Sequence, residues 1–208
     1  MYKKTGVKPP LWIVGIDEVG RGPLAGAVYV GAVMMRYKDY CKVKWPGLTD
    51  SKKMTALARD AWYRRAKEMK THGVLSIALT SRSVAMIDKK GINTCITKCI
   101  GSVLTKLTCN PRTTTVLLDG GLRAPEIYPS QQTIIRGDQS QKIISLASVI
   151  AKVTRDRYMA TLAKKYPYYG WESNKGYGTK DHIIRLKKHG LTLEHRRTYL
   201  KRILDNLA

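Results

Sequence analysis

Two adjacent carboxylates near the start of the chain combine residue types that could bind metal and phosphate. Asp17 and Glu18 follow the β-branched run at 13–16 and precede a Gly-Arg-Gly turn at 20–22. Side chains alternate along a strand, so a strand end can place one carboxylate in a cleft beside its neighbour's carbonyl. Such oxygens suit a divalent cation, and the glycines let a nucleic-acid backbone approach main-chain N–H groups. The alternative is a solvated acidic turn followed by a glycine hairpin.

Two further aspartates follow predicted strands. The run at 113–118 is typical of a strand buried on both faces and ends at Asp119, and a shorter strand at 133–136 leads to Asp138. Carboxylates gathered at one sheet edge repel one another unless a divalent ion neutralises them. The four acids therefore predict bound metal. A single aspartate at a strand end is, in the alternative, a turn or cap residue.

Charge and composition narrow the class of protein. The chain has 208 residues, with 38 Lys and Arg against 15 Asp and Glu, and a net charge of +23. This excess favours polyanionic partners, above all nucleic acid, although a general surface bias with weak binding is the alternative. The sequence contains neither a long apolar run nor a secretory leader, which predicts a cytoplasmic protein with no membrane span. The cysteine spacing does not fit a zinc site. Cys95 and Cys99, four apart on a predicted helix, are expected to be buried as small hydrophobic residues.

Hydrophobic periodicity predicts an α/β fold with a mixed sheet flanked by helices. The turn at 20–23 is short enough for an antiparallel hairpin. Besides those named above, strands are predicted at 12–17, 25–35 and 74–80, an irregular segment at 37–47, and helices at 56–69, 83–89, 92–107, 142–164, 180–189 and 193–207. We expect a catalytic domain at 1–165, and a small C-terminal helical cap at 166–208 that completes the substrate cleft.

Several sequence blocks, taken together, resemble one family. In order they are Gly15 to Gly26, Asp50-Ser51-Lys52-Lys53, Leu118-Asp119-Gly120, Gly137-Asp138, Ala147 to Asp156, Lys175 to Thr179 and Glu194 to Arg197. From about residue 13 to residue 200 they resemble ribonuclease HII, the type 2 ribonuclease H family. Two departures are Leu146, where a small residue is usual, and Tyr199, where the family often carries Phe.

The resemblance implies an RNase H-like fold and a metal-dependent endoribonuclease, expected to be a monomer. Such an enzyme hydrolyses the RNA strand of RNA–DNA hybrids and cuts on the 5′ side of ribonucleotides embedded in duplex DNA. It leaves 5′-phosphate and 3′-hydroxyl ends and uses two Mg²⁺ or Mn²⁺ ions. The catalytic and metal-binding acids map to Asp17, Glu18, Asp119 and Asp138. Asp156 is instead expected to form a solvated ion pair within a helix, beside Arg155 and Arg157.

The resemblance also assigns substrate contacts. The Gly20-Arg21-Gly22 backbone is implied to contact the nucleotide at the cut, and Tyr177 to pack on the sugar that follows. The alternative for Tyr177 is a loop aromatic packed on the core. Phosphate contacts are expected from the basic residues of the same blocks, each of which is otherwise a solvated surface charge: Lys52, Lys53, Arg155, Lys175, His195, Arg196 and Arg197.

Three alternatives differ in sequence features. A basic nucleic-acid-binding protein without catalysis is expected to lack one of the acids, and none is missing. Ribonuclease HIII carries an additional N-terminal domain, for which the roughly 12 residues before the first strand leave no room. A DDE-type transposase or junction resolvase shares acidic two-metal chemistry, but is not expected to carry both the Gly-Arg-Gly and the Gly-Tyr blocks.

Overall fold

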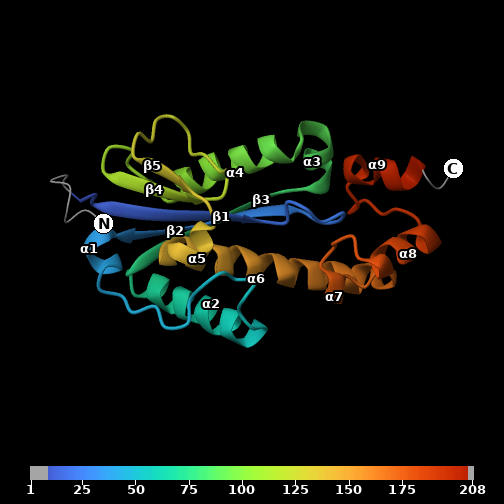
Figure 1. The fold of residues 1–208 in the computed structure, drawn as a ribbon, viewed down its shortest axis with the longest axis horizontal. Helices are drawn as coiled ribbons and strands as arrows, with labels where there is room; N and C mark the ends of the chain where they lie inside the picture. The colour runs from blue at the N-terminus through green and yellow to red at the C-terminus, as the bar shows by residue number, and fades with distance from the viewer. Residues whose placement is uncertain (1–8, 206–208) are drawn as a thin grey trace.

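A five-stranded mixed sheet forms the centre of the molecule (Figure 1). The computed structural model describes residues 9–205, and the side chains of residues 9–201. The strands, in the spatial order β3-β2-β1-β4-β5, are β1 (Trp12–Val19), β2 (Val28–Arg36), β3 (Leu75–Arg82), β4 (Thr114–Asp119) and β5 (Gln131–Ile134). Strands β1, β2 and β3 pair antiparallel, whereas β4 and β5 run parallel to β1. The predicted mixed sheet is therefore confirmed.

Helices cover both faces of this sheet (Figure 1). One face packs against α3 (Val84–Lys90) and α4 (Ile92–Lys106), and the other against α2 (Ala56–Thr71) and α6 (Lys142–Lys165). Helix α6 lies close to β1 and β2 because Gly15 and Gly31 have no side chain there; a Cβ atom on either would collide with the α6 backbone. No helix in the described part of the chain is long and apolar enough to cross a membrane.

The C-terminal segment packs around the far end of α6. It consists of the 3₁₀ helix η2 (Pro167–Tyr169), α7 (Trp171–Asn174), α8 (Lys180–His189) and α9 (Arg197–Asp205). Helix α8 has the predicted bounds, but α9 begins four residues later than expected. The delay arises because residues 195 and 196 bond to the segment that precedes β2, through a β-bridge from His195 to Ala25 and a bond from Arg196 N to Leu24 O. The last two predicted helical residues, 206 and 207, lie outside the described residues.

Three further boundaries differ from the predictions. The segment at 37–47 contains a short helix, α1 (Tyr37–Tyr40), and β2 begins at residue 28 because a longer loop joins it to β1. Strand β5 ends at Ile134, so Asp138 does not close a strand. It lies on the short helix α5 (Gly137–Ser140), which follows Arg136 in the left-handed conformation (φ 54°). Backbone strain of this kind is common beside functional sites.

Candidate active site

Three of the four predicted acids meet at one edge of the sheet. Asp17, Asp119 and Asp138 each offer a carboxylate oxygen, and these oxygens lie within 4.8 Å of one another. Strand alternation explains two of the positions. Asp17 shares the α6-facing side of β1 with Ile13, and Asp119 lies two residues beyond Leu117, which faces the same side. The parallel register pairs Ile16 with Leu118, so Asp17 and Asp119, the next residues, reach the same edge.

Hydrogen bonds hold these carboxylates in place. The Asp138 backbone N–H donates to Asp119 Oδ1 (3.3 Å), and Ser145 Oγ on α6 donates to the Asp138 carbonyl (2.5 Å). Asp17 Oδ1 accepts the Glu18 backbone N–H (2.7 Å), and Asp17 also bonds to the Ser148 hydroxyl of α6. The acids are thus fixed by backbone groups and by one face of α6.

Burial makes this group of carboxylates costly to ionise. Burial raises the pKa of Asp17 well above its ordinary value; the Ser148 hydrogen bond offsets this in part, and the charges of Glu18 and Asp119 add to it. The pKa of Asp138 rises to about 6, first through burial and then through the charges of Asp119 and Asp50. Buried like charges of this kind favour a bound cation, and carboxylate oxygens suit Mg²⁺ or Mn²⁺.

Asp50 is a further acid at the site, and the sequence pointed to it only as part of the Asp-Ser-Lys-Lys block. Asp50 is 6% exposed, its side chain bonds to that of Asp138, and its Oδ1 accepts the Lys52 backbone N–H (2.8 Å). The signal that would have identified it is the polar Asp-Ser-Lys-Lys run directly before a helix. Lys52 is exposed, and its charge lowers the pKa of Asp138, so this predicted substrate residue lies beside the acids.

Glu18 lies on the opposite face of β1, as the alternation of side chains requires. Its Oε1 accepts a bond from Arg21 Nε (3.0 Å). Both residues line a groove of about 510 Å³ on the α4 side, together with Asn93 and Arg123. The structure therefore does not bring Glu18 into the carboxylate group of Asp17, Asp119 and Asp138.

Asp156 lies outside the carboxylate group. It forms an ion pair with Lys152 (2.8 Å), one turn earlier on α6, rather than with its neighbours Arg155 and Arg157. Arg157 pairs with Asp60 (3.1 Å), and Arg155 points into the core. The predicted ion pair within the helix therefore exists, and it joins residues four apart because these share a helix face whereas adjacent residues do not.

The two predicted substrate loops pack against each other. The loop that contains Gly20, Arg21 and Gly22 docks on the Gly-Tyr loop through Leu24 N to Gly176 O (2.8 Å). A Cβ on Gly22 would lie 4.0 Å from Tyr177 Cε1. Tyr177 is 40% exposed, so it is not enclosed in the core.

Three predicted phosphate contacts are buried instead. Arg155 and Arg196 are fully buried and His195 is 1% exposed, so none can reach a phosphate. The Arg196 guanidinium donates to the carbonyls of Gly20 (2.6 Å), Arg21 (2.9 Å) and Gly26 (2.7 Å). The Arg155 guanidinium likewise donates to the carbonyls of Ala25, Ala27 and Lys175. Both cations therefore hold the two predicted substrate loops from inside the fold. A count of charges in the sequence cannot distinguish this buried role from phosphate binding at the surface.

Comparison with known sequences places the chain in a family. The family model described as Ribonuclease HII matches residues 14–202. Ribonuclease HII of Halalkalibacterium halodurans is 44% identical over 187 residues, which cover 90% of this chain and 66% of that protein. Ribonuclease HII of Bacillus mycoides is 41% identical over 188 residues, 90% of this chain and 68% of that protein. The chain thus spans about two thirds of the length of these curated relatives.

Solved structures share the fold. Ribonuclease H2 from Pyrococcus horikoshii OT3 has a TM-score of 0.73 and 24% identity, covering 94% of this chain and 98% of that one. The Archaeoglobus fulgidus structure described as a PCNA:RNase HII complex has a TM-score of 0.71 and 21% identity, with coverage of 89% and 94%. Bst-RNase HIII, solved with Mn²⁺, has a TM-score of 0.68 and 16% identity, with coverage of 96% and 71%. These neighbours confirm the RNase H-type fold, and the matches in sequence establish that the chain belongs to the ribonuclease HII family of nucleases, which are hydrolases.

Proposed function

We propose that the chain is an endoribonuclease that hydrolyses the RNA strand of RNA–DNA hybrids and cuts on the 5′ side of ribonucleotides embedded in duplex DNA. Such an enzyme acts as a monomer in the cytoplasm, in ribonucleotide excision repair. The observation that carries this proposal is the meeting of Asp17, Asp119 and Asp138 beside the docked Gly-Arg-Gly and Gly-Tyr loops. A nuclease needs both parts, one for the scissile phosphate and one for the sugar.

The buried carboxylates fit divalent cations. Asp17, Asp119 and Asp138 would hold two Mg²⁺ or Mn²⁺ ions, with Glu18 as the fourth ligand once its carboxylate leaves Arg21 and turns toward the strand end. When bound, such ions would supply activation of the attacking water and stabilisation of the leaving oxygen, and the products would carry 5′-phosphate and 3′-hydroxyl ends. The raised pKa of Asp138 supports this assignment, because a bound cation removes the repulsion among the acids.

The remaining site residues would bind and orient the substrate. Arg21 and Gly22 are exposed, and their backbone N–H groups have no hydrogen-bond partner among the described residues. These groups suit a phosphate or sugar oxygen of the nucleotide at the cut. Tyr177 would pack on the following sugar, and Lys52 would contact a phosphate near Asp138. Residues 166–208 would form the cap that completes this cleft over residues 1–165.

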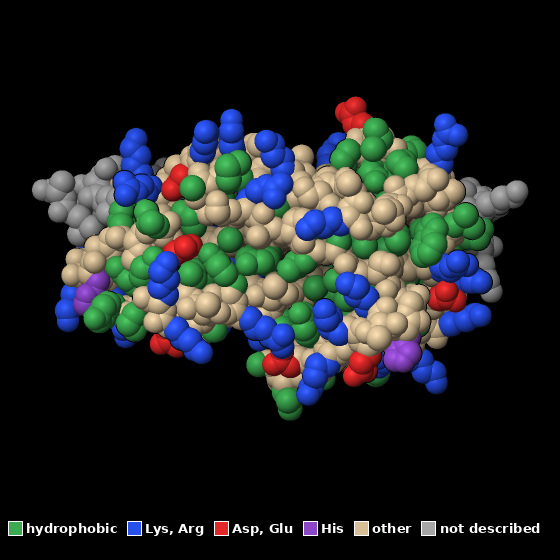
Figure 2. All heavy atoms as spheres, turned by 180° about the vertical axis from the view of Figure 1, so that it is seen from behind, with side chains coloured by type: hydrophobic (Ala, Val, Ile, Leu, Met, Phe, Trp, Pro, Cys, Tyr) green, Lys and Arg blue, Asp and Glu red, His purple; other side chains and the backbone are tan. Residues whose placement is uncertain are grey.

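Surface charge supports a polyanionic substrate. Figure 2 shows Lys and Arg side chains spread over the displayed face, with few acids among them. The net charge of +23 therefore favours binding along a nucleic-acid backbone. A basic binding protein without catalysis would share this surface, so only an assay for cleavage separates the two.

The test is incubation with Mg²⁺ or Mn²⁺ and a labelled DNA duplex that carries one ribonucleotide, beside an RNA–DNA hybrid and an all-DNA duplex. We expect cuts 5′ of the ribonucleotide and within the hybrid RNA, none in the all-DNA duplex, and none with EDTA. Binding of all three duplexes without cleavage would contradict the proposal and favour the non-catalytic alternative.

A further inference from the structure

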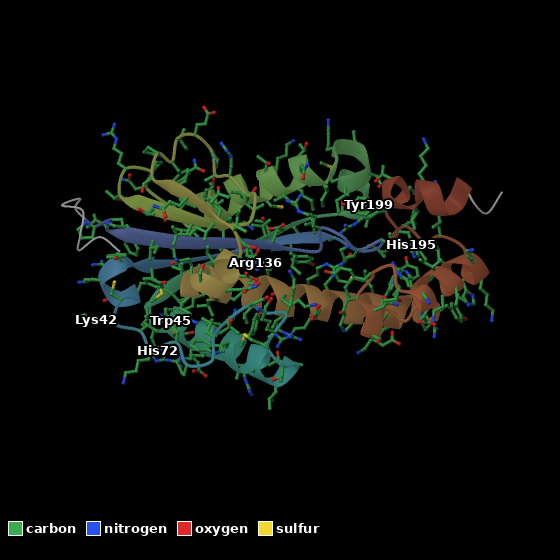
Figure 3. All side chains as sticks on the ribbon, in the orientation of Figure 1. Lys42, Trp45, His72, Arg136, His195 and Tyr199 are labelled. Atoms are coloured by element: carbon green, nitrogen blue, oxygen red, sulfur yellow. The ribbon has the colours of Figure 1, made fainter. Side chains whose placement is uncertain are left out.

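Two buried histidines lie in the C-terminal segment. His182 on α8 is fully buried and His195 is 1% exposed, and their Nε2 atoms are 3.3 Å apart. The rings of Tyr169 and Trp171 pack against the pair. Figure 3 shows His195 beside the C-terminal helices, well away from Arg136, which lies next to α5. Neither imidazole can touch a substrate, so any functional effect must pass through other residues.

Hydrogen-bond partners define the protonation of both rings. The Thr192 backbone N–H donates to His195 Nδ1 (3.0 Å), so the His195 proton is on Nε2. His182 Nδ1 is 2.8 Å from the Tyr177 carbonyl, which can only accept, so His182 carries its proton on Nδ1. His182 Nε2 is then free to accept from Trp171 Nε1 (3.0 Å) and from His195. Every ring nitrogen is paired when both histidines are neutral.

The electrostatic surroundings agree with neutral rings. Burial lowers the pKa of His182, although the Tyr177 carbonyl and the charge of Asp181 oppose the shift. Burial and the neighbouring His182 lower the pKa of His195 to about 4. A proton added to His182 Nε2 would face the donors of Trp171 and His195, which already point at that nitrogen.

This network ends on the substrate loop. The Tyr177 carbonyl accepts from His182 Nδ1 and from the Thr179 backbone N–H (2.8 Å), and the Tyr177 N–H donates to Asn174 O (2.9 Å). The backbone of Tyr177 is therefore held from both sides while its ring remains 40% exposed beside Gly22. The α8 helix adds a second connection, because His182 N donates to Thr179 Oγ1 (3.2 Å).

We infer that His182 is a positioning residue that fixes Tyr177 for the sugar at the cut, and that Trp171 and His195 hold His182 in the Nδ1–H tautomer that this requires. The inference rests on the proposed function, since it takes Tyr177 as the residue that packs on the substrate sugar. A ring fixed before the substrate arrives loses less freedom on binding, which favours productive orientation.

Two matched substitutions separate the hydrogen bond from the bulk of the ring. His182→Asn keeps an N–H near the position of Nδ1, whereas His182→Gln keeps an amide near Nε2 and loses the donor to Tyr177. We expect His182→Gln to lower kcat/KM at a lone ribonucleotide about tenfold, and His182→Asn less than about threefold. Equal losses in the two variants would overturn the inference.

A double-mutant cycle tests whether the effect passes through Tyr177. In the Tyr177→Ala background, His182→Gln should cause no further loss of cleavage at the lone ribonucleotide. The same tenfold loss in both backgrounds would indicate a merely structural role. Failure of the proposed function would look different: wild type would not cut this duplex, or Tyr177→Ala would cut it as wild type does.

Histidine ¹⁵N NMR of the wild-type protein, without metal or substrate, tests the tautomers independently of activity. The chain has four histidines, so assignment by single substitutions is tractable. We expect Nδ1–H for His182 and Nε2–H for His195 at pH 7. A charged ring, or a proton on His182 Nε2, would overturn the proposed network even if every substituted variant failed to fold.

Discussion

The acid group at the sheet edge and the buried arginines beneath the predicted substrate loops both place charges away from water. They differ in how these charges are compensated. Asp17, Asp119 and Asp138 bring negative charges together with few internal donors. Arg155 and Arg196 bring two positive charges into the core, and neither forms an ion pair within the described residues. Each guanidinium instead donates to three backbone carbonyls.

The two regions differ in whether their buried charges need a partner from outside the protein. The arginines are solvated by the protein itself, so their charge is already compensated when the chain folds. The carboxylates are not, and burial raises the pKa of Asp17 and Asp138. We interpret the first region as a structural support and the second as a site that is completed by cations.

We expect the greatest loss of stability when a buried arginine is replaced by an uncharged residue. Arg196→Met would leave the carbonyls of Gly20 and Gly26 without this donor, at a cost of about 3 kcal/mol or more of unfolding free energy. The Arg21 carbonyl would keep its bond from the Tyr199 hydroxyl (2.9 Å), which a Phe at that position could not donate. Urea unfolding measures the loss.

The neighbouring arginine supplies a matched control. Arg197 is exposed, so Arg197→Met should change the unfolding free energy by less than about 0.5 kcal/mol. Arg196→Lys should fall between the two, because it keeps the charge but not the planar set of donors. Similar destabilisation by the substitutions at 196 and 197 would remove the contrast between a buried support and a surface charge.

Removing a charge from the acid group should not destabilise the protein, in contrast to removing a buried arginine. Asp119→Asn removes one of three clustered charges, and its amide oxygen still accepts from Asp138 N. We expect cleavage to fall by about two orders of magnitude, while the metal-free protein becomes no less stable and hybrid binding is retained. Rate assays, melting in EDTA and a binding titration measure the three quantities.

Asp156→Asn is the control for this prediction. It removes a carboxylate from α6 that pairs with Lys152 and lies outside the acid group. We expect cleavage close to that of wild type. A loss as deep as that of Asp138→Asn would contradict the choice of Asp138 over Asp156, and unchanged turnover in Asp119→Asn would contradict the acid group itself.

The sequence predicted the acid group better than the arginine support, for a physical reason. Strand patterns placed Asp17 and Asp119 at neighbouring strand ends, because alternation and parallel pairing are local rules. The same alternation indicates that Glu18 faces the other side, although four acids at one edge were predicted. Asp138 was predicted at a strand end, yet β5 stops four residues earlier and α5 carries it.

The roles of Arg155 and Arg196 could not be predicted from their own surroundings in the sequence. Five of their six acceptors lie 128 to 176 residues away along the chain, and all six are backbone carbonyls, which every residue has. A basic residue in a basic chain therefore suggested a phosphate contact. The start of α9 was mispredicted for a related reason, because the β-bridge to Ala25 depends on tertiary packing.

A further effect is a change in the pH dependence of stability. It compares Asp138, in the acid group, with the buried His195 of the C-terminal segment. Asp138 has a folded pKa of about 6, above its ordinary 3.8, so the folded state binds that proton more tightly. Its contribution to metal-free stability is greatest below about pH 4 and is lost as pH rises toward 6. His195 has a folded pKa of about 4, below its ordinary 6.5, so its contribution is greatest above pH 6.5 and is lost as pH falls.

Asp138→Asn should therefore separate the pH dependence of stability that comes from Asp138 from the pH dependence that comes from His195. In EDTA the variant should be more stable than wild type at pH 7, and the advantage should shrink toward zero near pH 4, where Asp138 is already protonated in wild type. Because the opposing slope of Asp138 is removed while that of His195 remains, the variant should lose stability more steeply than wild type between pH 6.5 and 4. Urea unfolding across this range measures both curves, and a constant difference between them would mean that Asp138 titrates as an ordinary exposed carboxylate.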